Sequence, residues 1–470
     1  MKGDSKKSNK KTFKLFYDSL VNDLNQIQRY EYIFFIIIFI NNIICYLYYS
    51  YSFIKPDITP VHAFVSGEYD PIYPIITSSN HYAFTSMSTY PIINGKKIGN
   101  PICDYYQLLL YNNTIIQCLC DGCGIGIAPK LAATAAGQAA VQSIAKEIRE
   151  CSNIKEIAEN MIRAISDAHD NIFVVAENER KSYLIGATTI QLQVIVQLDS
   201  RDRKFGIITL NIGDCRSYLY SNSTLRTIYN YSSRESLSDV SNSQGRIGNG
   251  KEGMPDLGNA SLTYNECYDG DLIFMCSDGI NDNFDPEIIG VSSVGERKDD
   301  KIKSIENSIG QYIIHSNTLS ETIESIGEYV VGVTTRAREV QSTPQTPTTP
   351  KGNRTKAPGK LDHSTMALVR IELRNDNDFF YIDSFIPSYN YKINPNVSDT
   401  TIYRRSKIRR EHPQFFVINK DFVKPRTSSM SRTFHLKSPI HSFHSASNSA
   451  SLSPSSGLCI SPLDLQLSPE

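Results

Sequence analysis

Residues 269–287 read DGDLIFMCSDGINDNFDPE and contain the pattern that decides the fold. The apolar run at 271–276 has the length and composition of a buried strand, and Asp278-Gly279 follows directly after it. A carboxylate at the tip of a buried strand is costly unless a cation or hydrogen bonds neutralise it. The segment therefore predicts a strand that delivers an acidic group to a polar site.

Two other acidic positions share this arrangement. Asp121-Gly122 ends the apolar run TIIQCLC, and Asp362 directly precedes the run TMALVRI. Three such strand tips in one sandwich are expected to converge on hard divalent cations, which prefer carboxylate oxygens. A glycine after the aspartate also lets its carbonyl approach a metal closely. For any single Asp-Gly pair, an ordinary turn is the alternative interpretation.

The rest of the chain indicates a mixed architecture. Helical spacing predicts helices over 128–149, 154–178, 301–314 and 318–338, and apolar or alternating runs predict strands within 104–120 (as a hairpin) and over 189–198, 205–212, 217–220, 271–276, 365–373 and 379–382. Residues 57–103 are expected to contain short strands at most, and 230–265 a polar surface loop. This order favours an α+β sandwich over an alternating parallel sheet.

Charge is distributed unevenly over the 470 residues. The net charge of −1 excludes a uniformly basic nucleic-acid binder. Residues 1–31 carry +3 and residues 401–470 carry +6, which with Lys55 leaves −11 for 57–400. Because acidic clusters repel phosphate unless a cation intervenes, this middle region points to metal chemistry.

The chain ends predict other properties. Residues 32–54 carry no charge, follow six lysines, and are long enough to cross a bilayer. We expect a basic N-terminal segment at 1–31 and a transmembrane helix at 32–54. The protein is then a single-pass membrane protein, and the sequence does not determine its orientation in the membrane. A buried strand pair in a soluble cytoplasmic protein is the alternative. A flexible insertion at 340–360 and a basic, Ser-rich disordered tail at 401–470 complete the organisation, without a specific nucleic-acid partner.

Three cysteines form a C-x-C-x-x-C cluster of Cys118, Cys120 and Cys123. A zinc site is one interpretation, but no second Cys/His pair follows nearby to complete it. Small buried hydrophobic residues are the other interpretation.

Four segments in order resemble motifs of the metal-dependent serine/threonine protein phosphatases of type 2C, the PPM family. CLCDGCGIG resembles the first metal motif, D-G-H-G-G after an apolar strand. The other three are GATTIQLQVIVQL with FGIITLNIGDCRSYLY, DGDLIFMCSDGINDNFDPE, and KLDHSTMALVRI. They resemble G-S-T-A with N-V-G-D-S-R, D-x-F-L-I-L-A-S-D-G-L-W-D, and K-x-x-D-N-x-T-x-x-V-V. The matches span about 100–372, within a domain placed at 57–400.

The resemblance implies two antiparallel β-sheets in a sandwich flanked by helices, the PPM-type phosphatase fold. It also implies two or more Mg²⁺ or Mn²⁺ ions, a phosphoprotein substrate, and hydrolysis of phosphomonoesters by a metal-bridging hydroxide. By position, Asp121 matches the bridging carboxylate and Gly122 its carbonyl partner. The remaining metal positions match Asp278, Asp362, Asp104 and, for a third metal, Asp214.

Several positions depart from the family pattern. Gly99 stands where the phosphate-binding Arg is expected, and Cys103 replaces the Glu before Asp104. Cys123 replaces the His of D-G-H, and His363 the Asn after the last metal Asp. Lys96 and Lys97 are close enough in sequence to bind phosphate instead, but only as point charges.

These departures leave three hypotheses open. The first is an active protein serine/threonine phosphatase. The second is a catalytically weak or inactive pseudophosphatase that acts as a binding module. The third is a non-catalytic membrane protein whose motif matches are accidental, which predicts a fold without the two-sheet sandwich.

Overall fold

The structure is a computed structural model. It describes residues 51–56, 60–66, 76–178, 185–199, 203–228, 243–250, 253–291, 297–342, 357–374 and 432–435, the backbone alone for 61–66 and 432–435. The described residues belong to one compact unit.

One sheet has seven strands, all paired antiparallel. Their spatial order is β1 (Val61–Ser66), β6 (Tyr105–Leu110), β7 (Thr114–Cys120), β9 (Ile190–Gln197), β10 (Lys204–Ile212), β14 (Ser261–Tyr268) and β17 (Arg432–His435). The first long hairpin is β6–β7, in which Tyr105 pairs with Cys120. This register brings Asp104 and Asp121, one residue beyond each strand, to the same end of the sheet.

The second sheet has six strands, also antiparallel. Their order is β12 (Thr224–Thr227), β11 (Arg216–Ser221), β15 (Leu272–Cys276), β16 (His363–Arg370), β3 (Tyr82–Ser88) and β2 (Thr77–Ser78). The central pair β15–β16 aligns Cys276 with Met366. Two short pairs lie outside the sheets: β8 (Ala187–Thr188) with β13 (Ile247–Gly248), and β4 (Ile92–Ile93) with β5 (Lys96–Lys97).

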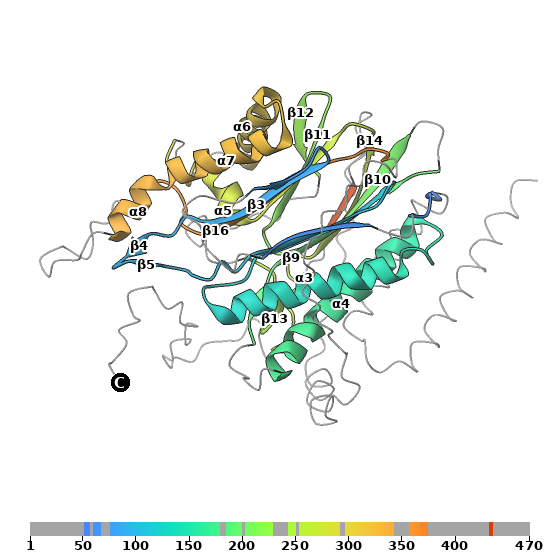
Figure 1. The fold of residues 1–470 in the computed structure, drawn as a ribbon, viewed down its shortest axis with the longest axis horizontal. Helices are drawn as coiled ribbons and strands as arrows, with labels where there is room; N and C mark the ends of the chain where they lie inside the picture. The colour runs from blue at the N-terminus through green and yellow to red at the C-terminus, as the bar shows by residue number, and fades with distance from the viewer. Residues whose placement is uncertain are drawn as a thin grey trace, which may run out of the picture. The chain divides into compact units, whose positions relative to one another are not determined.

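Helices cover both outer faces, so the domain has four layers (Figure 1). The seven-stranded sheet is covered by α3 (Ile127–Glu147) and α4 (Ile154–Asn178), and the six-stranded sheet by α6 (Lys298–His315) and α7 (Leu319–Val333). The remaining helices are α5 (Asp278–Asn281), η3 (Asp282–Phe284) and α8 (Thr335–Ser342). The start of α7 follows from its sequence, because the Thr318 hydroxyl accepts from the Glu321 amide at 3.1 Å as an N-cap.

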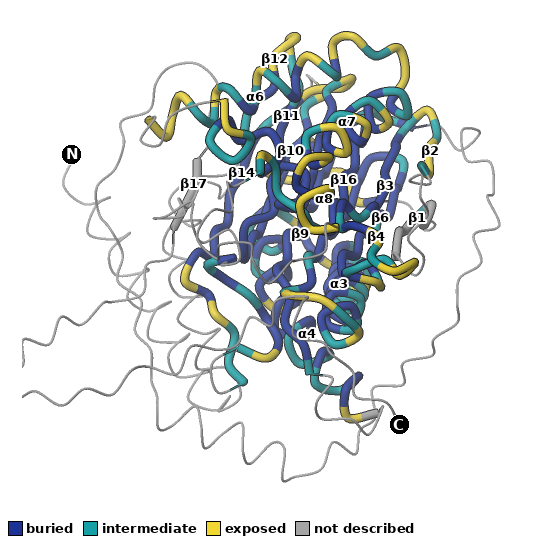
Figure 2. Tube along the Cα trace, turned by 90° about the vertical axis from the view of Figure 1, so that its left-hand side faces the viewer, coloured by how far each residue is buried: buried dark blue, intermediate teal, exposed yellow. Residues whose placement is uncertain are grey.

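The core has two layers, which Figure 2 shows as buried chain inside the domain. One apolar cluster, between the two sheets, contains Phe84, Tyr106 and Ile195, and a second, between the six-stranded sheet and helices α6 and α7, contains Phe274, Ile309 and Ile326. A buried polar chain crosses the seven-stranded sheet. The Tyr106 hydroxyl donates to Gln117, Gln117 donates to Gln193 at 2.8 Å, and Gln193 donates to Thr209. Gln191 and Gln193 of the alternating segment 189–198 are therefore buried and hydrogen-bonded to side chains of neighbouring strands, so the polar positions of that strand do not face solvent.

The fold confirms the predicted two-sheet sandwich with flanking helices, and the hypothesis of accidental motif matches is wrong on this point. Two local predictions are also wrong: β3 is a full strand within 57–103, and β14 begins inside the expected loop 230–265. The helix predicted over 318–338 is interrupted at Thr334 and continues as α8. Residues 379–382 lie outside the described residues.

The segments predicted to be membrane-spanning or disordered are only partly described. Residues 32–50 lie outside the described part, within which no helix is both long and apolar enough to cross a membrane. At the end of the predicted span, Ser52 and Phe53 form β-bridges to Asn153 and Leu198. This end of the predicted span is therefore part of the folded domain. Residues 343–356 of the insertion also lie outside. In the tail expected to be disordered, β17 is an exception, because it pairs with β14.

Candidate metal and phosphate site

Three strand tips carry the predicted acidic residues. Asp121 directly follows β7, Asp278 begins α5 and is separated from β15 by Ser277, and Asp362 directly precedes β16. Burial, followed by the charges of four carboxylates, raises the pKa of Asp121 well above its usual value. Those four neighbours are Asp104, Asp278, Asp362 and Asp214. The fold thus brings together all five predicted carboxylates, from both sheets.

Lys360 lies among these carboxylates. Its ammonium forms an ion pair with Asp278, a second with Asp362 at 2.9 Å, and a third with Asp282 at 3.2 Å. The Lys360 side chain is only 9% exposed, so its charge depends on these partners. Sequence reasoning missed both Lys360 and Asp282. Asp282 lies four residues after Asp278, a spacing that places two side chains on one face of a helix.

Asp104 is the most buried member of the cluster. It is 0% exposed, and neither carboxylate oxygen has a hydrogen-bond partner among the described residues. Burial and the charge of Asp362 raise its pKa to about 7, although the nearby hydroxyls of Thr365 and Ser277 favour the charged form. A buried carboxylate that these hydroxyls compensate only in part, beside other carboxylates, favours a cation in this place.

Backbone contacts fix the Asp121 end of the site. The Asp121 carbonyl accepts from the Thr189 amide and the Thr188 hydroxyl, each at 2.8 Å. Gly122 leaves no room for a side chain, because a Cβ there would lie 2.7 Å from the Pro129 carbonyl oxygen and 2.8 Å from that of Cys103. The glycine of this motif is therefore required by close packing between the end of β7 and the start of α3.

Asp362 is oriented by its neighbours. Its carboxylate accepts from the His363 amide at 2.9 Å and from the Tyr90 hydroxyl at 3.4 Å. Burial raises its pKa to about 6, while Lys360 opposes this shift. Asp214 follows Gly213, whose amide donates to the Asn259 side chain at 2.9 Å. Backbone amides next to Asp362 and Asp214 are thus held by hydrogen bonds, which fixes the chain that carries these two carboxylates.

The positions that depart from the family pattern lie next to this cluster. Gly99 has φ +78°, and a Cβ there would lie 2.5 Å from the Tyr90 ring. The imidazole of His363 contacts both the Gly99 carbonyl and the Cys103 amide. The space for a residue-99 side chain is therefore taken by Tyr90, a residue that the motif comparison did not indicate.

The predicted phosphate-binding lysines differ in their surroundings. Lys96 is exposed on β5, whereas the Lys97 ammonium donates to the Ser88 carbonyl at 3.1 Å. The charge of Lys97 also reaches His363, as does that of Lys130, a buried cation of α3 that the sequence did not single out. Of the two predicted lysines, Lys97 is thus the one adjacent to the site.

The cysteines do not form the alternative zinc site. The thiols of Cys118 and Cys120 lie 3.8 Å apart inside the sheet, while Cys123 contacts Ser243. Within the described part of the chain, no three His, Cys, Asp or Glu side chains are arranged to share one metal ion. The carboxylate cluster is no exception, and there the Lys360 ammonium forms ion pairs with Asp278 and Asp362. The chemistry of the donors, hard carboxylate oxygens with the Gly122 carbonyl, nonetheless fits Mg²⁺ or Mn²⁺.

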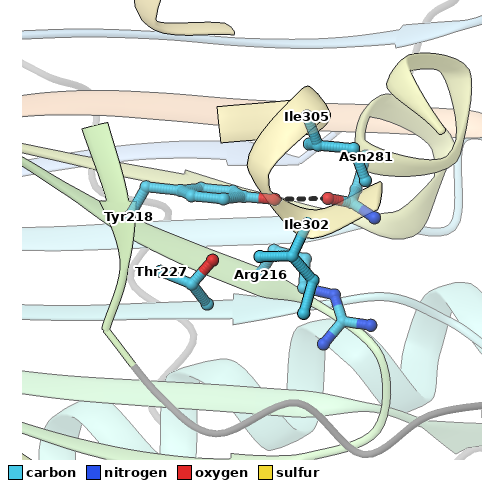
Figure 3. A pocket seen from close by; sticks show the side chains of 6 residues that line it. All are labelled: Arg216, Tyr218, Thr227, Asn281, Ile302 and Ile305. Atoms are coloured by element: carbon cyan, nitrogen blue, oxygen red, sulfur yellow. Dashed lines mark hydrogen bonds between the residues drawn. The ribbon is translucent and has the colours of Figure 1, made fainter. Parts of the chain in front are cut away.

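A small pocket adjoins α5 but contains none of the predicted site residues. It is lined by Arg216, Tyr218, Thr227, Asn281, Ile302 and Ile305 (Figure 3). Its volume of about 10 Å³ is close to what one water molecule needs. The Tyr218 hydroxyl donates to the Asn281 side chain, which fixes the segment that carries Asp278 and Asp282. We assign the pocket a structural role.

Comparison with known proteins finds a relative that contains a PP2C-like domain. No protein-family profile matches the chain. Over 214 residues it is 26% identical to the PP2C-like domain-containing protein CG9801 of Drosophila melanogaster, which covers 43% of this chain and 29% of that protein. The match therefore spans less than a third of the fly protein's length. It confirms the resemblance to the type 2C phosphatases.

Solved structures give weaker likenesses. The serine/threonine phosphatase of S. agalactiae is 15% identical with a TM-score of 0.36, covering 66% of this chain and 100% of its own. The catalytic domain of the phosphatase PstP, in complex with two manganese ions, is 15% identical with a TM-score of 0.36, covering 62% and 99%. At these TM-scores the fold assignment rests on the sheet order and helix layers of this chain.

Proposed function

We propose that this domain is a metal-dependent protein serine/threonine phosphatase that hydrolyses phosphomonoesters of phosphoproteins. The observation that carries the proposal is the convergence of Asp104, Asp121, Asp214, Asp278 and Asp362 at one end of the sandwich. A structural role does not account for so many carboxylates, because their mutual repulsion and burial cost stability. A phosphoryl-transfer site uses them to hold cations.

The donors suggest how the cations would be held. Asp121, Asp278 and Asp362, with the carbonyl of Gly122, would hold two or more Mg²⁺ or Mn²⁺ ions, with Asp104 and Asp214 beside them. Bound there, the ions would supply a lowered pKa for a water molecule and positive charge for the phosphoryl oxygens.

The chain itself would orient the substrate and the carboxylates. Lys97, whose charge reaches His363, would attract the phosphate group, while exposed Lys96 would act only at longer range. The Tyr90 hydroxyl orients the Asp362 carboxylate. These roles stand in for the missing arginine without its bidentate geometry, so we expect weak binding of the phosphate group.

A second function has its own supporting observation. Lys360 already neutralises part of the cluster, and the arginine and histidine positions of the family hold Gly99 and Cys123. Both features support a pseudophosphatase that binds phosphoproteins or partners without turnover.

Turnover by the full chain separates the two functions. We would measure hydrolysis of a phosphothreonine peptide with Mn²⁺ for the wild type, Asp121→Asn and Asp278→Asn. Asp167→Asn is the control, because Asp167 is exposed on the surface of α4, where it accepts a hydrogen bond from the Ser143 hydroxyl. Mn²⁺-dependent turnover lost only in the two site variants supports the phosphatase. Mn²⁺ binding without turnover in the wild type would overturn it in favour of the pseudophosphatase.

A further inference from the structure

The backbone of Lys360 is held firmly beside the acidic segment 278–284. The Lys360 amide donates to the Asn283 side-chain oxygen at 2.8 Å, and the Asn283 amide group donates back to the Lys360 carbonyl at 3.0 Å. The same Asn283 group donates to the Gly279 carbonyl at 2.7 Å. One asparagine therefore ties Lys360 to the helical turn that carries Asp278 and Asp282.

The residue before Lys360 adds to this restraint. Gly359 has φ +87°, a conformation that favours glycine, and its amide donates to the Ile288 carbonyl at 3.1 Å. A Cβ at this position would approach Val333 to 3.1 Å. The local chain thus turns tightly so that Lys360 enters the cluster, and the position of Lys360 follows from backbone contacts independent of its charge.

The ammonium matches the carboxylates around it. A lysine has three N–H donors, and three carboxylates surround this one: Asp278, Asp282 and Asp362. One positive charge among three negative charges leaves the group acidic, and Asp121 and Asp104 add to that excess. Lys360 therefore neutralises the cluster only in part.

We infer that Lys360 is an internal counter-ion that competes with divalent cations for Asp278 and Asp362. This inference rests on the proposed metal-binding function of the same carboxylates. A cation that binds both residues must displace the ammonium. The four-carbon stem of lysine allows this without movement of the clamped backbone. Lys360 keeps the metal-free domain folded and lowers its apparent affinity for metal.

Metal binding measured without turnover tests the competition. The full chain, freed of metal by a chelator and dialysed, is titrated with MnCl₂ by calorimetry as wild type, Lys360→Met and Lys360→Gln. Both neutral variants should bind Mn²⁺ roughly tenfold more tightly than the wild type, a size usual for coupling between two binding events. Without metal they should unfold at a lower temperature, and Mn²⁺ should raise that temperature more than in the wild type.

Two control variants isolate the cause. Lys301 forms an ion pair with Glu287 outside the cluster, and both side chains are 12% exposed, similar to Lys360. Lys301→Met therefore measures the loss of a buried lysine ion pair alone. It should leave Mn²⁺ affinity unchanged. Lys360→Arg keeps the charge and should not gain affinity. If Lys360→Met does not fold, Lys360→Gln, which keeps the length and a donor group, decides the question.

The outcomes that overturn the inference are specific. Mn²⁺ binding by both neutral variants that is no tighter than in the wild type contradicts competition, as does an equal gain in Lys301→Met. Failure of the proposed function is distinguishable. Tighter Mn²⁺ binding by the neutral variants, without turnover in any protein, would support the counter-ion role of Lys360 and reject the proposed phosphatase activity. Turnover by the wild type, without a gain of Mn²⁺ affinity in the neutral variants, would support the phosphatase activity and reject the counter-ion role.

Discussion

The imidazole of His363 donates from Nε2 to the carbonyl oxygen of Gly99 at 2.6 Å. Because a carbonyl only accepts, the Nε2 atom carries the proton, and Nδ1 accepts from the Cys103 amide at 3.3 Å. Burial lowers the pKa of His363 to about 4, consistent with a neutral ring. Three positions that depart from the family pattern, Gly99, Cys103 and His363, are thus one hydrogen-bonded unit beside Asp362.

His363→Asn, which introduces the family residue, should destabilise this protein. The shorter amide cannot span from β16 to both backbone partners, so buried groups at Gly99 or Cys103 lose a bond, at about 1–3 kcal/mol. Chemical denaturation measures the loss. His169→Asn is the comparison, since His169 accepts from the Gly248 amide at 3.0 Å away from the carboxylates. His169→Asn should also lower stability, and it should leave Mn²⁺ affinity unchanged. A His363→Asn protein as stable as wild type would refute the spanning role.

Restoring the family arginine by Gly99→Arg should fail for steric reasons. A Cβ at residue 99 would lie 2.5 Å from Tyr90 Cδ2, and φ +78° adds strain. We expect a loss of about 1–3 kcal/mol in unfolding free energy. Adding Tyr90→Ala should recover the steric part, so the double variant should lose less than the two single losses combined. Additive losses in denaturant titrations would show that Tyr90 does not occupy this space.

The sequence predicted the strand tips well, because Asp121, Asp278 and Asp362 each border an apolar run that is long enough to be a buried strand. It failed at β14, where buried polar residues resemble a loop. Asn265 in that strand is 0% exposed and donates to the Ile228 carbonyl at 2.6 Å. β3 was underestimated for the same reason, since its Ser86 bonds to Thr365 of β16 at 2.7 Å. Polar residues satisfied by distant strands leave no local hydrophobic pattern.

The same limit applies to the site. Convergence of the carboxylates followed from shared local patterns, whereas the Lys360 ion pairs depend on a turn held by Asn283 about 80 residues away in the chain. Nothing in the spacing of Lys360 and Asp278 shows that they meet. Likewise, Tyr90 reaches Asp362 only because β3 and β16 pair, with Ser88 opposite His363. Such contacts depend on tertiary structure and have no local sequence signature.

Gly279→Ala should be strongly destabilising, although Asp-Gly pairs are often only turns. A Cβ at Gly279 would lie 1.9 Å from the His363 carbonyl oxygen, so α5 would have to move away from β16. We expect a loss of about 3 kcal/mol or more, as for overpacked cores. Gly332→Ala in α7 is the matched control, because a Cβ there meets nothing within 4 Å and alanine favours helices. Thermal unfolding should show a gain for Gly332→Ala. Equal effects of the two substitutions would contradict the close approach.

Tyr90→Phe separates the positioning role of the hydroxyl from the packing role of the ring. The ring packs edge-on against His363, with centroids 5.3 Å apart, and phenylalanine retains this contact and the cover over Gly99. Only the donor to the Asp362 carboxylate is lost. Because that bond is 3.4 Å long, stability should change by less than about 1 kcal/mol. Groups that orient metal ligands typically change metal affinity or activity about 10–100-fold when removed, so Mn²⁺ affinity should fall by about tenfold.

Tyr312→Phe, on α6 beside Phe284, serves as the control and should match the wild type. A Tyr90→Phe protein with wild-type Mn²⁺ affinity would limit Tyr90 to packing, whereas a large loss of stability would mean that the hydroxyl holds the fold rather than the carboxylate.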